Sequence, residues 1–430
     1  MPNTIFPQIG RWRLVVYWLS IAMLAAAPVL ETPWLRWLGC GIFGAQALSN
    51  LGLRALFRAN ARGLPNLSET SHGSNELPGV TVVVPARNEE DTVEAGVRSL
   101  LSLDYPRLEI IAVNDGSTDG TAQILNRSAE DDPRLHVIYD PPLPEGWQGK
   151  ANAVWVAVGE SNPSYPWLLL TDADVRFAPE SLRRALAIAV GHELDFLTCI
   201  PYLDNQSFWE ELLMPATWAG LAIGARPGML NEPHSAPIGI GPCILVKREV
   251  YLQSGGHSAV RNRQPEDSFL AAVVKESGGR MGVALAVDQV QVRIYRGLKP
   301  MLEALVTKLR IQQRLQPGCM EIRLAHTLLQ EVLPLPLGMV ACAAHVASGS
   351  THLSWIAFGA MGIAAYASWA YTISAFRTVA KQRALVEWLH PIGGIIRVAL
   401  TLRAWRDEIA GVPLTWRDRE VSAPEPQNPD

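Results

Sequence analysis

Apolar residues gather at the two ends of the chain. Neither Leu14–Leu30 nor Trp37–Leu53 contains a charged residue, and the longer stretch Val332–Phe376 contains none either. Each of the first two runs approaches the roughly 20 residues that a membrane helix needs. The third is long enough for two such helices with a turn near residues 348–350. The pattern therefore predicts a transmembrane helical hairpin at each end of the chain.

Three apolar segments allow more than one interpretation. The first run follows Arg11 and Arg13, so it also resembles a cleaved signal peptide, although the second run directly after it favours a hairpin. The weaker stretch Trp388–Leu402 is compatible with a fifth span, a re-entrant helix or an interfacial helix. The segment Phe208–Leu230 is too interrupted to span, and it suits an interfacial helix or a buried core helix equally well.

Basic residues predict the orientation of these helices. They lie before the first and after the second predicted helix, and again before the third and after the fourth. These residues are Arg11, Arg13, Arg54, Arg58, Arg62, Arg310, Arg314, Arg323, Arg377, Lys381 and Arg383. Two hairpins place all of them on one side of the membrane, which the positive-inside rule identifies as cytosolic. The middle of the chain is therefore predicted to be cytosolic.

The middle of the chain, residues 78–290, alternates strand and helix patterns. Short β-branched runs predict strands, and apolar residues at helical spacing predict the helices between them. The predicted strands are 79–85, 109–114, 135–139 and 167–172, and the predicted helices are 89–103, 121–129 and 150–158. This alternation indicates an α/β domain with a Rossmann-like, mainly parallel sheet, whose ligands bind at the carboxyl ends of the strands.

Composition narrows the functional class. Charged residues make up 18% of the chain and hydrophobic residues 48%, with a net charge of -4 and a mean hydropathy of +0.10. These values exclude a disordered chain, and they give no basic field for a nucleic-acid partner. The five cysteines contain no CxxC pair, which indicates reduced thiols rather than a disulfide scaffold or a zinc site.

Two acidic motifs carry candidate chemistry. Asp172 and Asp174 directly follow an apolar strand, and a carboxylate pair at that position suits Mg²⁺ or Mn²⁺ together with the diphosphate of a ligand. A solvated acidic turn is the alternative. Glu266 and Asp267 precede an apolar helical run, where one carboxylate can act as a general base. Taken alone, that second pair fits the ordinary acidic start of a helix better.

Two further motifs point to a nucleotide. Lys150 begins a predicted helix, where the helix dipole disfavours a cation unless it meets an anion such as phosphate. Asp115 lies in a polar turn after a strand, where its carboxylate can accept a hydrogen bond from a nucleobase such as uracil. An ordinary turn with a helix cap explains Asp115 equally well. The segment from Arg87 to Glu89 opens a helix whose amides can hold an anion.

Taken together and in this order, the motifs VPARNEE, VNDGSTDGT, GKANA, TDADV and the Glu-Asp pair resemble the family 2 glycosyltransferases of the GT-A fold. The resemblance covers about residues 80–290 and is strongest to the membrane-attached, hopene-associated branch. It implies that the nucleotide sugar is bound by Pro85, Ala86, Arg87, Glu89, Asp115, Gly116, Lys150 and Asp172. It also implies a metal on Asp172 and Asp174, with Asp267 as the catalytic base.

The chain departs from the family pattern beyond the base. Processive and ceramide-type members carry a Gln/Arg-x-x-Arg-Trp motif, whereas the candidates here, around Arg293 with Arg296 and Gln313 with Arg314, lack the tryptophan. These four residues, with Glu266 and Gly241, remain possible acceptor or diphosphate contacts. The missing tryptophan disfavours a processive synthase.

The sequence thus predicts an inverting, metal-dependent glycosyltransferase that moves a sugar, with a UDP-sugar as the expected donor, to a membrane lipid of hopanoid, carotenoid, sphingolipid or polyprenol type. A processive polysaccharide synthase is the alternative, and a non-catalytic membrane scaffold is a further one. The expected location is a bacterial-type inner membrane. The expected regions are a transmembrane hairpin (1–57), a linker (58–77), a GT-A domain with interfacial helices (78–327), a transmembrane region (328–404) and a partly disordered cytosolic tail (405–430).

Overall fold

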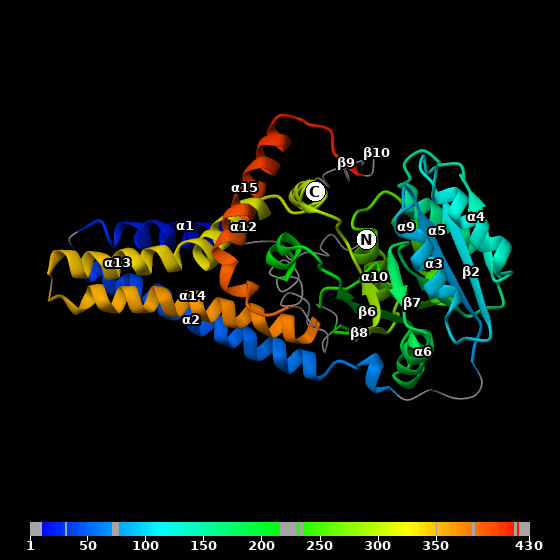
Figure 1. Ribbon diagram of the computed structural model, residues 1–430, viewed down its shortest axis with the longest axis horizontal. Helices are drawn as coiled ribbons and strands as arrows, with labels where there is room; N and C mark the ends of the chain where they lie inside the picture. Colours follow the sequence, from blue (N-terminus) through cyan, green and yellow to red (C-terminus); the bar gives the residue numbers. More distant parts are fainter. Residues whose placement is uncertain are drawn as a thin grey trace.

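The computed structural model describes residues 11–30, 32–70, 77–215, 230–232, 235–349, 351–380, 383–416 and 419–420. It combines an elongated helical bundle with a rounded α/β body, and the two parts lie end to end (Figure 1). Most of the predicted segment 208–230 and the end of the predicted tail lie outside the described residues. Within that segment, residues 208–215 are helical.

Four parallel strands form the first half of the sheet, as the sequence predicts. They are β1 (Val80–Ala86), β2 (Leu108–Asn114), β3 (Leu135–Tyr139) and β4 (Trp167–Leu170), in the spatial order β3-β2-β1-β4. Strands β1, β2 and β4 are mostly buried on both faces because helices cover both sides, whereas the edge strand β3 is partly exposed. Val82 and Val84 face one core, and Val83 faces the other.

The second half of the sheet is mixed, so the whole sheet has four parallel and three antiparallel pairings and the prediction of a mainly parallel sheet applies best to its first half. It comprises β5 (Val175–Phe177), β6 (Phe196–Leu203), β7 (Ile244–Lys247) and β8 (Met281–Val292), and it extends the order as β4-β7-β6-β8-β5. Three of its pairings, β4 with β7, β7 with β6 and β8 with β5, are antiparallel. Helices still alternate with strands after Asp174, since α6 lies between β5 and β6 and α10 precedes β8, so the alternation alone does not reveal which of these strands pair antiparallel.

Helices cover both faces of the sheet. One core lies under α3 (Val93–Leu101), α4 (Thr121–Asp131) and α6 (Ser181–Gly191), and the other lies under α5 (Gly149–Glu160) and α10 (Glu266–Glu276). The three helices predicted in this part of the chain are confirmed as α3, α4 and α5. Three short elements complete the body: η1 (Leu67–Glu69), α8 (Arg248–Gln253) and α9 (Gly256–Ala259).

Four helices form the bundle: α1 (Arg11–Ala26), α2 (Pro33–Arg62), α13 (Pro334–Ser348) and α14 (Leu353–Ala380). They run side by side away from the α/β body (Figure 1). Phe43 and Phe358 stack in the bundle core with ring centroids 5.3 Å apart. Among the described helices, Leu353–Arg377 alone is long and apolar enough to cross a bilayer by itself, and Cys319–Val332 with Pro334–Ser348, bent by 46°, qualifies as a pair.

The junction between the bundle and the body contains the remaining elements: α11 (Leu298–Leu315), α12 (Cys319–Thr327), the π-helix η3 (Leu328–Val332), η4 (Val386–Leu389), α15 (His390–Ile409), β9 (Thr415–Trp416) and β10 (Arg419–Glu420). The ambiguous stretch 388–402 thus becomes the end of η4 and most of α15. Figure 1 shows α15 running across the base of the bundle rather than along it.

A buried arginine secures the sheet edge opposite the strand carboxyl ends. Arg248 donates from Nε to the Tyr165 carbonyl (2.7 Å) and from Nη2 to the hydroxyls of Ser161 (2.9 Å) and Thr81 (3.1 Å). Because the groups are buried, their hydrogen bonds cannot be replaced by water without rearrangement.

Replacing this arginine should destabilise the fold. We expect Arg248→Met to lower the free energy of unfolding by about 2–4 kcal/mol, since it leaves buried hydroxyl and carbonyl groups unpaired. The matched control is Arg98→Met, whose ion pair with Glu94 is exposed (75% and 57%) and which should cost less than about 1 kcal/mol. Denaturant titrations in detergent, followed by circular dichroism, compare them. Equal losses would contradict the structural role of Arg248.

Candidate active site

The candidate site lies at the carboxyl edge of β1, β2 and β4. Asp172 comes two residues after the end of β4, and the Thr171 backbone N–H still donates to Val83 of β1 (3.2 Å). The Thr171 hydroxyl donates to the carbonyl of Pro242 (2.8 Å), so the strand end is tied to the loop that precedes β7. Asp174 follows in the turn that leads into β5.

Lys150, in the first turn of α5, lies between two carboxylates. Its Nζ is 2.6 Å from Asp172 Oδ1 and 2.6 Å from Glu266 Oε1. Desolvation acts to lower the pKa of Lys150, but the two carboxylates outweigh it and hold that pKa above its ordinary value. Desolvation acts to raise the pKa of Glu266, but the ammonium group outweighs it and lowers that pKa. Lys150 and Glu266 are therefore charged at neutral pH, and two carboxylates face a single ammonium group.

Two glycines bring the loop before β7 against this cluster. A Cβ on Gly239 would lie 2.1 Å from the Asp267 carbonyl oxygen, so only glycine permits this approach. A Cβ on Gly241 would lie 3.4 Å from carboxylate oxygens of both Asp172 and Asp267, and 3.6 Å from Lys150 Nζ. Side chains from three separate sequence motifs therefore meet around Gly241.

Asp267 is held by the backbone at the start of α10. Its Oδ2 accepts from the Gly241 N–H (3.0 Å), and its Oδ1 accepts from the Ser268 N–H (2.7 Å). Desolvation and the neighbouring Glu266 raise the pKa of Asp267 above its ordinary value, although Lys150 partly offsets them. A carboxylate with a raised pKa in a fixed orientation suits proton abstraction near neutral pH.

The two polar loops after β1 and β2 are bonded to each other. Arg87 Nη1 donates to the carbonyls of Asp115 (2.6 Å) and Gly116 (3.1 Å), and the Glu89 N–H donates to the Thr121 hydroxyl (2.8 Å). Arg87 thereby supports the shape of the loop that carries Asp115.

The strand end beneath these loops is equally constrained. The Asp115 N–H donates to the Ala86 carbonyl (2.9 Å), directly after Pro85, and Asp115 is 5% exposed. Strand β1 lies between β2 and β4 in the sheet. Asp115, after β2, and Asp172, after β4, therefore lie at separate positions along one edge of the sheet. That spacing suits a ligand with a base at one end and a diphosphate at the other.

Asp140 also shapes this edge, although the sequence analysis did not select it. Its Oδ1 accepts from Asn114 Nδ2 (2.8 Å) and from the Gly116 N–H (2.9 Å). Its position in the sequence could have identified it, because Asp140 directly follows β3 just as Asp115 directly follows β2. Its carboxylate fixes the turn that carries Asp115.

A divalent cation fits the site only with help from a ligand. The described residues contain no group of three or more His, Cys, Asp or Glu side chains that could hold a metal by themselves. Mg²⁺ is commonly bound through one or two carboxylates together with substrate phosphates and water. Asp172 and Asp174 are the two carboxylates at the strand end that fit such a role.

Arg293 and Arg296 lie after β8 and differ in their surroundings. Arg293 Nη2 is 3.3 Å from Oε1 of Glu210, which is 1% exposed and also accepts from the Gly297 N–H (3.4 Å). Arg296 is exposed. Glu210 was not selected from the sequence, although a carboxylate in an apolar segment is a recognisable signal.

Gln313 and Arg314 connect helices at the junction. Gln313 Oε1 accepts from the Met320 N–H (3.0 Å), which closes the turn between α11 and α12. Arg314 Nε is 2.5 Å from Glu408 Oε1 on α15. Of the six residues expected as further contacts, Glu266 and Gly241 therefore lie in the cluster, whereas Gln313 and Arg314 form helix–helix contacts.

The central region of the chain is similar to known glycosyltransferases. Residues 81–254 match the model of the family described as Glycosyl transferase family 2. A probable glycosyltransferase, YdaM, of Bacillus subtilis is 36% identical over 99 residues, which are 23% of this chain and 23% of that protein. A poly-beta-1,6-N-acetyl-D-glucosamine synthase of Staphylococcus aureus is 36% identical over 100 residues, again 23% of each chain.

Matches to solved structures have lower sequence identity. The mannosyltransferase PcManGT from Pyrobaculum calidifontis, in complex with GDP-Man and Mn²⁺, covers 77% of this chain and 98% of its own at 21% identity, with a TM-score of 0.48. S. aureus TarS 1-349 with UDP-GlcNAc covers 77% of this chain and 92% of its own at 15% identity, with a TM-score of 0.38.

Removing the Lys150 charge should strengthen binding of a divalent cation. We expect Lys150→Met to bind Mn²⁺ about tenfold more tightly in the absence of nucleotide, because an ammonium beside Asp172 repels a second cation. Titration followed by the electron paramagnetic resonance signal of free Mn²⁺ measures this. The matched control is Lys247→Met, which removes a similar pair with Asp195 (2.7 Å) away from the cluster. Unchanged affinity in Lys150→Met would contradict a cation site at Asp172.

Proposed function

We propose that the protein, whose residues 81–254 match the Glycosyl transferase family 2 model, transfers a sugar from a nucleotide sugar to a hydroxyl group of a membrane lipid. The observation that carries the proposal is the convergence of Lys150, Asp172 and Asp267 around Gly241. Glycosyl transfer needs a positive group for the leaving diphosphate and a base for the acceptor, and this cluster offers both.

The donor is assigned to the edge between Asp115 and Asp172. We assign the base, uracil in a UDP-sugar, to Asp115 and Gly116, and the pocket around it to Pro85, Ala86, Arg87 and Glu89. Lys150 then contacts the diphosphate after leaving one of its present carboxylate partners. A divalent cation, Mg²⁺ or Mn²⁺, held by Asp172 and Asp174 would neutralise charge that develops on the leaving diphosphate.

Asp267 is proposed as the base of an inverting displacement. Its carboxylate takes the proton from the acceptor hydroxyl as the oxygen forms a bond to the anomeric carbon of the sugar. The bond from that carbon to the diphosphate oxygen breaks on the opposite face, and the nucleoside diphosphate leaves with the electron pair. The backbone donors Gly241 and Ser268 keep the carboxylate oriented during this step.

The lipid acceptor is supported by the helices that flank the domain. The bundle exposes large apolar side chains, including Trp12 (66%), Leu48 (72%) and Val346 (79%), which a bilayer would cover. An integral membrane protein with its catalytic domain on the cytosolic side would hold the site beside lipid hydroxyls. A hopanoid, carotenoid, sphingolipid or polyprenol would each provide such a group.

A processive polysaccharide synthase is the second candidate. It is favoured by the match to the poly-beta-1,6-N-acetyl-D-glucosamine synthase, which spans 23% of each chain. It is disfavoured because neither Arg296 nor Arg314 is followed by tryptophan. Product size separates the candidates, since a lipid carrying one sugar and a polymer differ in mass and in extraction into organic solvent.

Neutralising the proposed base should abolish turnover. Purified protein in nanodiscs containing bacterial lipid extract, with a UDP-sugar and Mn²⁺, should release UDP. We expect Asp267→Asn to lower kcat by about 10²–10⁴-fold while UDP binding measured by calorimetry is retained, since the amide cannot accept the proton. Asp131→Asn, at the exposed end of α4, is the control. Full turnover by Asp267→Asn would overturn the assignment of the base.

A further inference from the structure

The exposed side of helix α15 is apolar, whereas the exposed side of a helix in a soluble domain is usually polar. Its exposed positions are Ile392, Ile395, Ala399, Leu402, Arg406 and Ile409, of which Arg406 alone is charged. The four large apolar side chains are 45%, 58%, 47% and 79% exposed, in that order. Their spacing of three and seven residues places them on one side of the helix, which we call the outer face of α15.

Charged side chains of α15 form ion pairs with α11. Glu408 is 2.9 Å from Arg310 Nε and 2.5 Å from Arg314 Nε, both on α11, and Arg403 is 2.7 Å from Glu303 on the same helix. These ion pairs connect α15 to α11.

Alongside these ion pairs, Leu400 and Ala404 of α15 pack in an apolar core with Val306 of α11 and Met320 of α12. Helix α15 is therefore apolar on its buried side and on its outer face, which is the arrangement expected where lipid rather than water covers the exposed side.

The apolar surface continues into η4. Leu385, Trp388 and Leu389 are 71%, 42% and 39% exposed, and Trp388 belongs to the residue type that prefers the membrane–water interface. The Trp388 carbonyl accepts a hydrogen bond from the Tyr366 hydroxyl of α14 (2.7 Å), which fixes η4 against the bundle.

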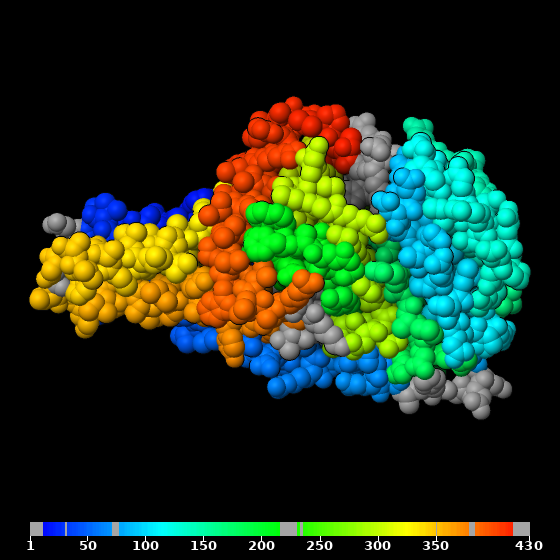
Figure 2. Space-filling view, viewed as in Figure 1, coloured from blue at the N-terminus to red at the C-terminus, as the bar shows by residue number. Residues whose placement is uncertain are grey.

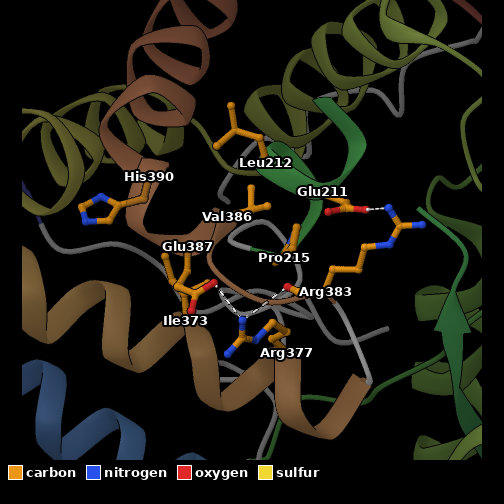
Figure 3. A pocket seen from close by; sticks show the side chains of 9 residues that line it. All are labelled: Glu211, Leu212, Pro215, Ile373, Arg377, Arg383, Val386, Glu387 and His390. Carbon is orange, nitrogen blue, oxygen red and sulfur yellow. Dashed lines mark hydrogen bonds and ion pairs between the residues drawn. The ribbon is translucent and has the colours of Figure 1, made fainter. Parts of the chain in front are cut away.

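One ion pair holds η4 at the end of α14, and a second joins the residues before η4 to the helical residues 208–215. Figure 3 shows a hollow between them, in which Arg377 Nη1 of α14 is 3.2 Å from Glu387 Oε2, and Arg383 Nη1 is 3.3 Å from Glu211 Oε1. The end of α14 therefore lies at the same level as the start of α15. If α14 crosses a bilayer, this level is the bilayer surface.

The orientation of α15 is consistent with a position at the bilayer surface. Figure 2 shows α15 as a column of atoms across the base of the bundle, with α11 on the side of the α/β body. A bundle that stands along the bilayer normal therefore puts α15 in the plane of the membrane. The ion pairs with α11 lie on the side of α15 that is nearer the α/β body. The outer face is therefore directed away from the body and toward the bilayer.

We propose that the outer face of α15, together with η4, lies in the boundary between headgroups and acyl chains and contacts lipid along its whole length. This excludes a fifth span, and it commits the face to the bilayer rather than to a protein partner. The proposal rests on the membrane location in the proposed function. Through α11, the contact would set the height of the α/β body above the membrane.

Spin labels that report depth test this in the full-length protein. The five native cysteines are replaced, single cysteines are introduced at Ile395 and Ile409, and the labelled proteins are placed in nanodiscs of phosphatidylglycerol and phosphatidylcholine. Labels at Ile363 of α14 and at Asp131 of α4 serve as the bilayer and water references. Because both test residues are exposed, the labels should not disturb the core.

An in-plane helix predicts equal depths at the two test positions, with oxygen accessibility between those of the references. A spanning helix would instead separate the positions by about 21 Å along the normal, because 14 residues rise 1.5 Å each. That result, or water-like values at both positions, would overturn the proposal. The readout involves no sugar transfer, so its failure is distinct from failure of the proposed reaction.

Discussion

The ion cluster of Lys150, Asp172 and Glu266 is the constraint on which the rest of the site depends. Its carboxylates come from a strand end and from the start of α10, and they remain together because one ammonium lies 2.6 Å from each. Burial and the neighbouring Glu266 raise the pKa of the adjacent Asp267. In our proposal, this one cluster therefore supports both a divalent cation and the base beside it.

The backbone makes the cluster possible. Parallel strands β1, β2 and β4 end at one edge, which brings Asp115 and Asp172 to the same surface. Gly239 then lets the loop before β7 approach the backbone of Asp267 more closely than any other residue could. The antiparallel insertion of β7 beside β4 positions this loop, so the mixed half of the sheet serves the site as much as the parallel half does.

Local patterns in the sequence predict the parallel strands and most of the cluster, because a strand followed by a polar turn is visible without tertiary information. The contribution of Gly239 could not be predicted, since its need for glycine comes from a residue 28 positions away, Asp267. Gln313 and Arg314 were selected by motif, yet their partners are Met320 and Glu408, which only the packed helices reveal. Hydropathy likewise left residues 388–402 undecided, because it cannot distinguish a lipid-facing side of α15 from a buried one.

The central claim is that this cluster transfers a single sugar to a membrane lipid. Mass spectrometry of lipids from cells that produce the natural chain, compared with cells that produce the Asp267→Asn variant at equal levels, tests it most directly. The account predicts a lipid whose mass exceeds that of its precursor by one sugar residue, present with the natural chain and absent with the variant. Identical lipid profiles, or a polymer made only by the natural chain, would contradict it.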